Sequence, residues 1–214
     1  RTMSAGTTSN PFDRNLDAFL GPSARRTLVL VGHLPVMSGL WLSQYADREA
    51  RESGPVALLR IEQDAVQLEL FRVGGRGPAV PMRSSLADAL RAIASGVSTW
   101  MVVPRASQTV PSADGFTNVV VLTGSDETAV VAAYGLLKGC VERSAEPDAA
   151  GRTDVAPARR AAPPLSVAVL GADEEMTARV AERLGRTTRA FLEFAVPVRG
   201  DLRQVAPVES AFRG

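Results

Sequence analysis

The chain has 214 residues and a formal net charge of +1, with one cysteine and one histidine. Hydrophobic residues make up 45% of the chain and charged residues 22%, which is typical of a folded globular protein and excludes a largely disordered chain. No apolar run reaches the roughly 18–20 residues needed to cross a bilayer and no signal peptide opens the sequence, so we expect a cytoplasmic protein without a transmembrane segment.

Charge and cysteine content narrow the function classes further. The net charge provides no field that would draw the chain to nucleic acid, and we expect no nucleic-acid partner. The single Cys140 excludes an intramolecular disulfide, and with the single His33 it leaves few ligands for a zinc site. Cys140 is therefore interpreted as a small core residue or a surface residue.

The N-terminal half alternates apolar runs with segments of helical periodicity. In chain order, the predicted elements are a short helix at 13–20, a strand at 28–31, a helix at about 36–52, strands at 56–61 and 66–72, and a helix between Ser84 or Ser85 and Gly96. Within the strand at 66–72, Gln67 and Glu69 alternate with apolar side chains, which predicts one wetter face at an edge of the sheet.

The C-terminal half continues the alternation. In chain order, the predicted elements are a strand at 99–103, a strand at 118–124, a helix at about 126–143, a strand at 165–170, a helix from 173 to about 191, and a last strand at 193–198. Acidic residues at the start of the helices at 126 and 173 are interpreted as helix caps, because they complement the helix dipole.

Strands separated by helices predict an α/β fold with a mostly parallel, doubly wound sheet and helices on both faces, in three layers. Residues 1–24 are expected to form a flexible lead-in with a short helix. Residues 25–214 are expected to form a single domain with a loose insertion at about 144–164, a stretch rich in Ala, Pro, Asp and Arg.

The first strand-turn-helix junction has the layout of a phosphate-binding loop. Gly32 opens the turn and the helix starts near Ser38, so backbone N–H groups at the helix N-terminus could cradle a phosphate. The only lysine in the chain is Lys138, in a different predicted helix. A phosphate loop without its cation lacks much of the electrostatic stabilisation that phosphoryl transfer needs.

The C-terminal half resembles the MinD/ParA-like group of deviant P-loop ATPases, and most nearly the branch that regulates flagellar number and placement. In that family an apolar strand leads into a Thr-x-x-(Glu or Asp) turn and a helix with a tyrosine and a late lysine. The matching residues here are Thr123, Asp126, Tyr134 and Lys138. Further similar segments are 165–170, 181–184, 191–194 and 196–201.

Each departure from the family pattern lies at a position whose side chain takes part in nucleotide or metal binding in the family. The family's Lys-Gly-Gly-x-Gly-Lys-(Thr or Ser) loop is replaced here by residues 33–39, with Ser38 where a lysine belongs and Gly39 where the magnesium-binding hydroxyl belongs. The segment at 100–105 lacks the metal-linked aspartate, and the base-reading asparagine is replaced within 169–172. The resemblance therefore implies a degenerate, inactive P-loop NTPase-like domain with no cofactor, no metal and no catalytic residue.

The sequence leads to two hypotheses for function. The first is a non-catalytic interaction or regulatory module that binds a protein partner or a second copy of itself, since the family pairs two subunits face to face. The resemblance implies a role in flagellar, secretion or cell-positioning assemblies. In this interpretation Gly32, Ser38 and Gly39 form a vestigial loop, and Trp41 either packs under the sheet or stands at an interface.

The alternative is a domain that still binds a nucleotide or another anion at the carboxyl ends of the strands, with weak or no hydrolase activity. Gly32 and Gly39 would then cradle the phosphate through their backbone N–H groups. Arg60 or Arg105, at or just past predicted strand ends, would replace the missing lysine with a bidentate contact.

Overall fold

The computed structural model describes residues 24–34, 38–62, 66–73, 75–76, 86–105, 110–113, 115–145 and 163–201. Eight strands form one sheet in the order β4-β3-β2-β5-β1-β6-β7-β8. The strands are β1 (Arg25–Val31), β2 (Val56–Ile61), β3 (Val66–Arg72), β4 (Gly75–Arg76), β5 (Thr99–Val103), β6 (Asn118–Thr123), β7 (Leu165–Leu170) and β8 (Val198–Asp201). The described helices are α2 (Ser38–Ser53), α3 (Leu86–Ala94), α4 (Glu127–Ala145) and α5 (Glu174–Leu192).

The sheet is mixed but mostly parallel. Every neighbouring pair from β2 through β5, β1, β6 and β7 to β8 is parallel. Only β3 and β4, at one edge, pair antiparallel, because the four residues between β2 and β3 are too few for a crossover helix. The predicted α/β class with a mostly parallel sheet is confirmed.

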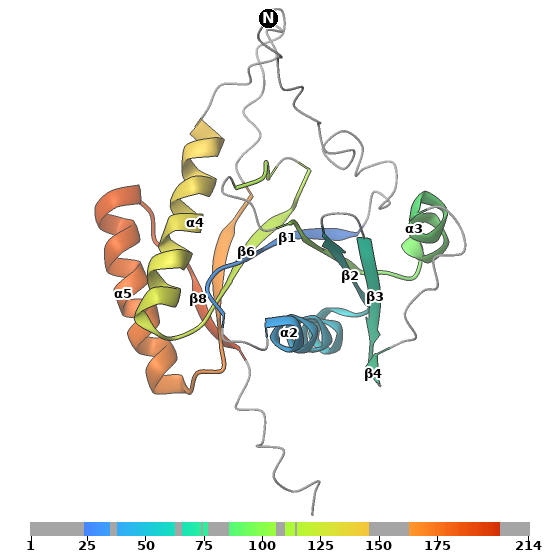
Figure 1. Cartoon of the computed structure of the whole chain (residues 1–214), viewed down its shortest axis with the longest axis horizontal. Helices are drawn as coiled ribbons and strands as arrows, with labels where there is room; N and C mark the ends of the chain where they lie inside the picture. The colour runs from blue at the N-terminus through green and yellow to red at the C-terminus, as the bar shows by residue number, and fades with distance from the viewer. Residues whose placement is uncertain are drawn as a thin grey trace, which may run out of the picture.

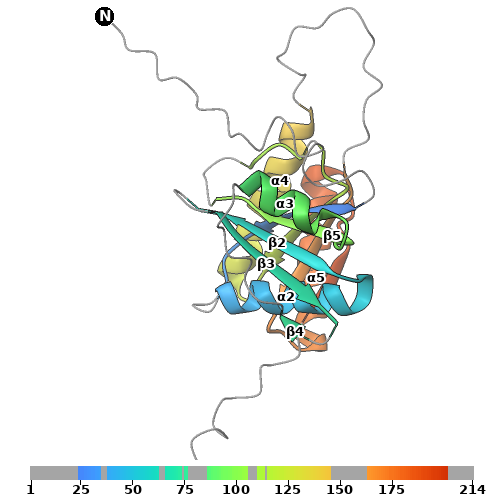
Figure 2. The same ribbon diagram turned by 90° about the vertical axis from the view of Figure 1, so that its right-hand side faces the viewer.

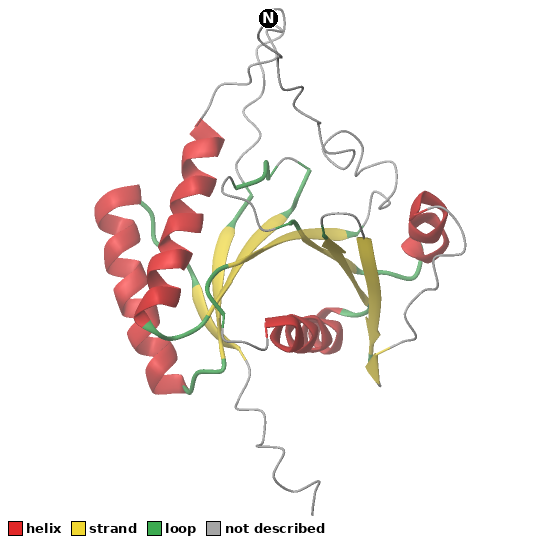
Figure 3. Cartoon of the chain, viewed as in Figure 1, coloured by secondary structure: helices red, strands yellow, loops and turns green. Residues whose placement is uncertain are grey.

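Helices cover both faces of the sheet, as predicted. The curved sheet wraps around α2 on one face, while α3, α4 and α5 lie on the other (Figure 1, Figure 3). Figure 2 shows α2 and α3 on opposite sides of β2 and β3. The central strands read as continuous β-branched and aliphatic runs because both of their faces are buried, as in β6, where Val119 to Thr123 are all buried.

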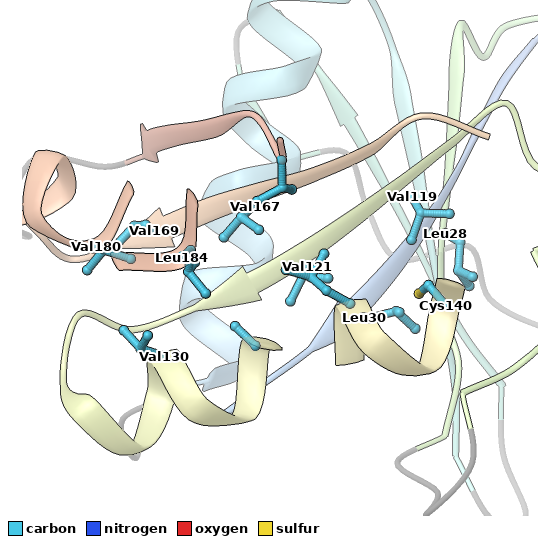
Figure 4. Packing of buried hydrophobic residues seen from close by; sticks show 13 residues of the cluster. Leu28, Leu30, Val119, Val121, Val130, Cys140, Val167, Val169, Val180 and Leu184 are labelled. Carbon is cyan, nitrogen blue, oxygen red and sulfur yellow. The ribbon is translucent and has the colours of Figure 1, made fainter. Parts of the chain in front are cut away.

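One of the buried clusters lies between the sheet and helices α4 and α5. Valines of β6 and β7 point toward Val130 of α4 and toward Val180 and Leu184 of α5 (Figure 4). Cys140 belongs to this cluster, so it is a core residue, and burial raises the pKa of its thiol to about 11. The thiol is therefore neutral at physiological pH and packs as a small apolar group.

The expected caps at the starts of α4 and α5 are present. Asp126 accepts a hydrogen bond from the backbone N–H of Ala129 at 2.9 Å, and Asp173 accepts one from that of Met176 at 2.7 Å. Each carboxylate satisfies a backbone donor that the first helical turn leaves unpaired.

Replacing Asp173 by alanine is expected to lower the free energy of unfolding by about 1 kcal/mol, because the Met176 N–H loses its acceptor. Chemical denaturation measures the change. Glu175→Ala is the matched control: Glu175 is exposed and, among the described residues, its ion pair is with Arg179 one turn later, so its loss is expected to cost less than about 0.5 kcal/mol. Equal effects of the two substitutions would contradict the assignment of Asp173 as the cap.

Two predictions at the sheet edges are wrong in detail. The strand predicted at 193–198 begins only at Val198, because Glu193 takes a left-handed conformation (φ 58°) that ends α5, and 193–197 form the connection. The strand at 66–72 is expected to expose the face that carries Glu69. In the structure Glu69 is buried, because α2 covers this face of β3.

Several predicted segments lie partly outside the described residues. The short helix at 13–20 and most of the lead-in at 1–24 fall there. Helix α4 continues to Ala145, into the first residues of the predicted insertion, and residues 146–162 are not described. Among the described ranges, no helix has both the length and the hydropathy that spanning a bilayer requires.

Candidate functional site

The carboxyl end of β1 is the natural place for a ligand in this topology. Strand β1 lies between β5 and β6, and the chain leaves β1 and β6 toward opposite faces, to α2 and α4. Open α/β sheets bind their ligands where successive connections diverge in this way. The loop that follows β1 is also the loop with the phosphate-binding layout, so topology and sequence point to the same place.

Backbone hydrogen bonds tie the loops after β1 and β6 together. The N–H of Gly32 donates to the carbonyl of Leu122 at 2.9 Å, and the N–H of Gly124 donates to the carbonyl of His33 at 3.3 Å. A Cβ on Gly32 would lie 3.2 Å from the Leu122 oxygen, so the glycine permits this close approach. The backbone N–H groups of Gly32 and Gly124 therefore donate to carbonyl groups of the protein itself.

Helix α2 begins at Ser38, as predicted, and Gly39 is exposed in its first turn. Residues 35–37 of the predicted loop lie outside the described residues. His33 is exposed in the turn, where its carbonyl accepts the bond from Gly124. The first turn of α2 contains no acidic residue.

Arg60 lies at this first turn. From β2, its Nη2 donates to the Ser43 hydroxyl at 2.8 Å and to the Gly39 carbonyl at 3.3 Å. The same nitrogen lies 3.5 Å from a carboxylate oxygen of Glu69, on β3. Arg60, predicted as an alternative contact for an anion, thus lies beside Gly39 of the predicted loop, but it pairs with the Glu69 carboxylate of the protein itself. Arg105, two residues past β5, is exposed.

Trp41 covers the end of β7. Gly171, directly after β7, has φ +70°, and a Cβ there would lie 3.0 Å and 3.1 Å from two carbons of the Trp41 indole. Trp41 also packs against the buried cluster between α2 and the sheet. Of its two predicted alternatives, Trp41 therefore takes the packed one. The sequence pattern does not link Gly171 to Trp41; its local signal is a glycine directly after a buried strand.

Exposed aliphatic side chains lie on the rim of this site. Val31 at the end of β1 is 38% exposed and Leu40 in the first turn of α2 is 39% exposed. Leu34, between them in the chain, packs partly against the cluster under α2. Exposed aliphatic side chains on both sides of a loop are more typical of a protein contact than of a site for a charged ligand.

Acidic side chains do not converge here. Within the described ranges, no group of three or more His, Cys, Asp or Glu side chains could hold a metal ion. The nearest acidic residue along the chain after β6, Asp126, caps α4, and Glu69 pairs with Arg60. Both carboxylates therefore interact with groups of the protein itself.

Comparisons with known proteins leave the family open. No protein-family model matches the chain, and no curated protein matches it. What the fold itself establishes is an α/β protein built on a mixed, mostly parallel sheet, with a candidate site at the carboxyl end of β1.

Proposed function

We propose that the chain is a non-catalytic domain of MinD/ParA-like fold that acts as a protein-interaction or regulatory module. The observation that carries this proposal is the Trp41 indole packed on Gly171. In the resemblance on which the proposal rests, the residues after this strand read the nucleotide base. Here an aromatic side chain of the protein occupies the space next to them.

The charges at the site support the same proposal. Phosphoryl transfer needs cations free to meet a phosphate, and the Arg60 guanidinium already faces Glu69 and the Ser43 hydroxyl. The N–H groups of Gly32 and Gly124 already have backbone acceptors. A triphosphate would have to displace these internal partners before it could bind.

The exposed aliphatic side chains on the rim of the site give the proposed module its contact surface. Val31 and Leu40 are exposed on both sides of the loop after β1. Contact through this end of the sheet would correspond to the face-to-face pairing that the resemblance implies, but without nucleotide between the subunits. Flagellar, secretion and cell-positioning assemblies are the settings that the resemblance suggests.

Light scattering on the purified chain, with and without magnesium and ATP, tests the proposal. We expect the molar mass at each protein concentration to be the same in both conditions. Leu40→Glu is expected to reduce self-association or partner binding, while Val131→Glu, on the exposed face of α4, is expected to leave it unchanged. A dimer that forms only with magnesium and ATP would contradict a nucleotide-independent module.

A second candidate, an anion-binding domain, is favoured by the position of Arg60 at the first turn of α2. It requires that an anion compete with Glu69 for the guanidinium. Titration with inorganic phosphate and pyrophosphate separates the two candidates, because a ligand at a hundredfold excess over its dissociation constant stabilises a protein by about 2.7 kcal/mol. We expect no such stabilisation.

A further inference from the structure

The Arg60 guanidinium joins three elements at the start of α2. It extends from β2 to the Gly39 carbonyl and the Ser43 hydroxyl of α2, and to Glu69 on β3. The Ser43 hydroxyl itself donates to the Gly39 carbonyl at 3.1 Å, so the three groups form one connected set of hydrogen bonds. The Arg60 side chain is 19% exposed and that of Glu69 8%.

The position of this cation runs against the usual electrostatics of helices. A positive charge near a helix N-terminus is unfavourable, because the helix dipole is positive there. The first turn of α2 has no acidic residue to offset it, whereas α3, α4 and α5 each have at least one. The carboxylate of Glu69 supplies the missing negative charge from a neighbouring strand.

The register of the sheet explains how Glu69 reaches this place. Arg60 pairs with Gln67 across the β2–β3 ladder, and Glu69 pairs with Leu58. Arg60 and Glu69 are therefore diagonal neighbours, and α2 contacts both of their strands. Diagonal neighbours on one face are within reach of long side chains.

We propose that Arg60 is a positioning residue, an internal clamp that holds the first two turns of α2 on the β2–β3 hairpin in the absence of any ligand. Glu69 keeps the guanidinium at the helix N-terminus, and Ser43 and the Gly39 carbonyl receive its hydrogen bonds. This inference goes beyond the proposed function, because it concerns what orders the candidate site and not what binds to it.

Hydrogen exchange on the full chain without ligand tests the clamp. In the double variant Arg60→Met/Glu69→Leu, which removes both charges at similar volume, we expect peptides covering 39–46 to exchange about tenfold faster or more. Peptides from β6 and α5 are expected to exchange as in the wild type. Arg60→Lys is expected to give an exchange rate between those of the wild type and the double variant, because lysine keeps the positive charge but its side chain is shorter than the one that carries the Arg60 Nη2 to its three partners.

The control is Arg179→Met, which removes an exposed arginine that pairs with Glu175 within α5. It is expected to leave exchange in α2 unchanged. Wild-type exchange of 39–46 in the double variant would overturn the proposal, because packing alone would then hold the helix start. Faster exchange spread evenly over all peptides would also overturn it, because the effect would be global. Neither result bears on nucleotide binding, so the clamp and the proposed function fail separately.

Discussion

Replacing Gly171 by alanine is expected to lower the free energy of unfolding by about 2 kcal/mol or more. Two costs combine at this position. The backbone has φ +70°, where a side chain is strained, and the new Cβ would lie 3.0 Å from the Trp41 indole. The indole would have to move away from the end of β7. Urea unfolding followed by circular dichroism measures the change.

Gly115→Ala is the matched control for this substitution. Gly115 has a similar φ of +78°, but a Cβ there would meet nothing within 4 Å. Its substitution carries the backbone cost alone, so the difference between the two variants isolates the contact with Trp41. Equal destabilisation by both variants would show that Trp41 does not press on Gly171, and the support for a filled site would be lost.

The second large effect is expected at Gly139, in α4. Alanine normally stabilises a helix relative to glycine by about 1 kcal/mol, and Gly135→Ala should do so because a Cβ there meets nothing within 4 Å. At Gly139 the Cβ would lie only 2.6 Å from a methyl carbon of Val110. Overpacking of this kind costs about 1–3 kcal/mol, so Gly139→Ala is expected to destabilise the protein.

These two substitutions make the same chemical change four residues apart in one helix, yet we expect them to change the free energy of unfolding in opposite directions. Thermal unfolding of both variants beside the wild type gives the comparison. Stabilisation by both alanines would mean that Val110 does not pack against α4 at Gly139.

The sequence alone predicts correctly those helices and strands that are specified by residues close together in the chain. Strands such as 118–123 are apolar throughout because both faces are buried, and the helix starts at Asp126 and Asp173 follow from caps that lie within a few residues. The strand predicted at 193–198 begins too early, because the apolar residues 194–197 belong to the connection after α5. Nothing in the local pattern separates an apolar connection, of which only Val196 is buried, from a short edge strand.

The contacts that define the candidate site join residues far apart in the chain. Trp41 meets Gly171, and Arg60 meets Glu69 and Ser43, through the order of the strands and the register of the β2–β3 ladder. A periodicity of two or 3.6 residues contains no information about such pairs. For this reason Glu69 was assigned to a wet face, although α2 and Arg60 cover it.

Helix capping also accounts for part of the resemblance on which the functional proposal rests. Thr123 donates from its hydroxyl to the Ala129 carbonyl at 2.9 Å, and Asp126 caps α4. The Thr-x-x-Asp turn is thus satisfied by local structure, independent of any bound nucleotide. The missing cation and the position of Trp41 therefore carry more weight for function than this motif does.

Calorimetric titration of the full chain with ATP and magnesium tests most directly whether the protein itself fills the end of its sheet. We predict no saturable heat of binding. The Trp41 indole lies against Gly171, Glu69 pairs with Arg60, and the N–H groups of Gly32 and Gly124 donate to backbone carbonyls, so the groups that a nucleotide would need are already engaged within the protein. Saturable binding of one ATP per chain, abolished by Arg60→Met, would contradict the account.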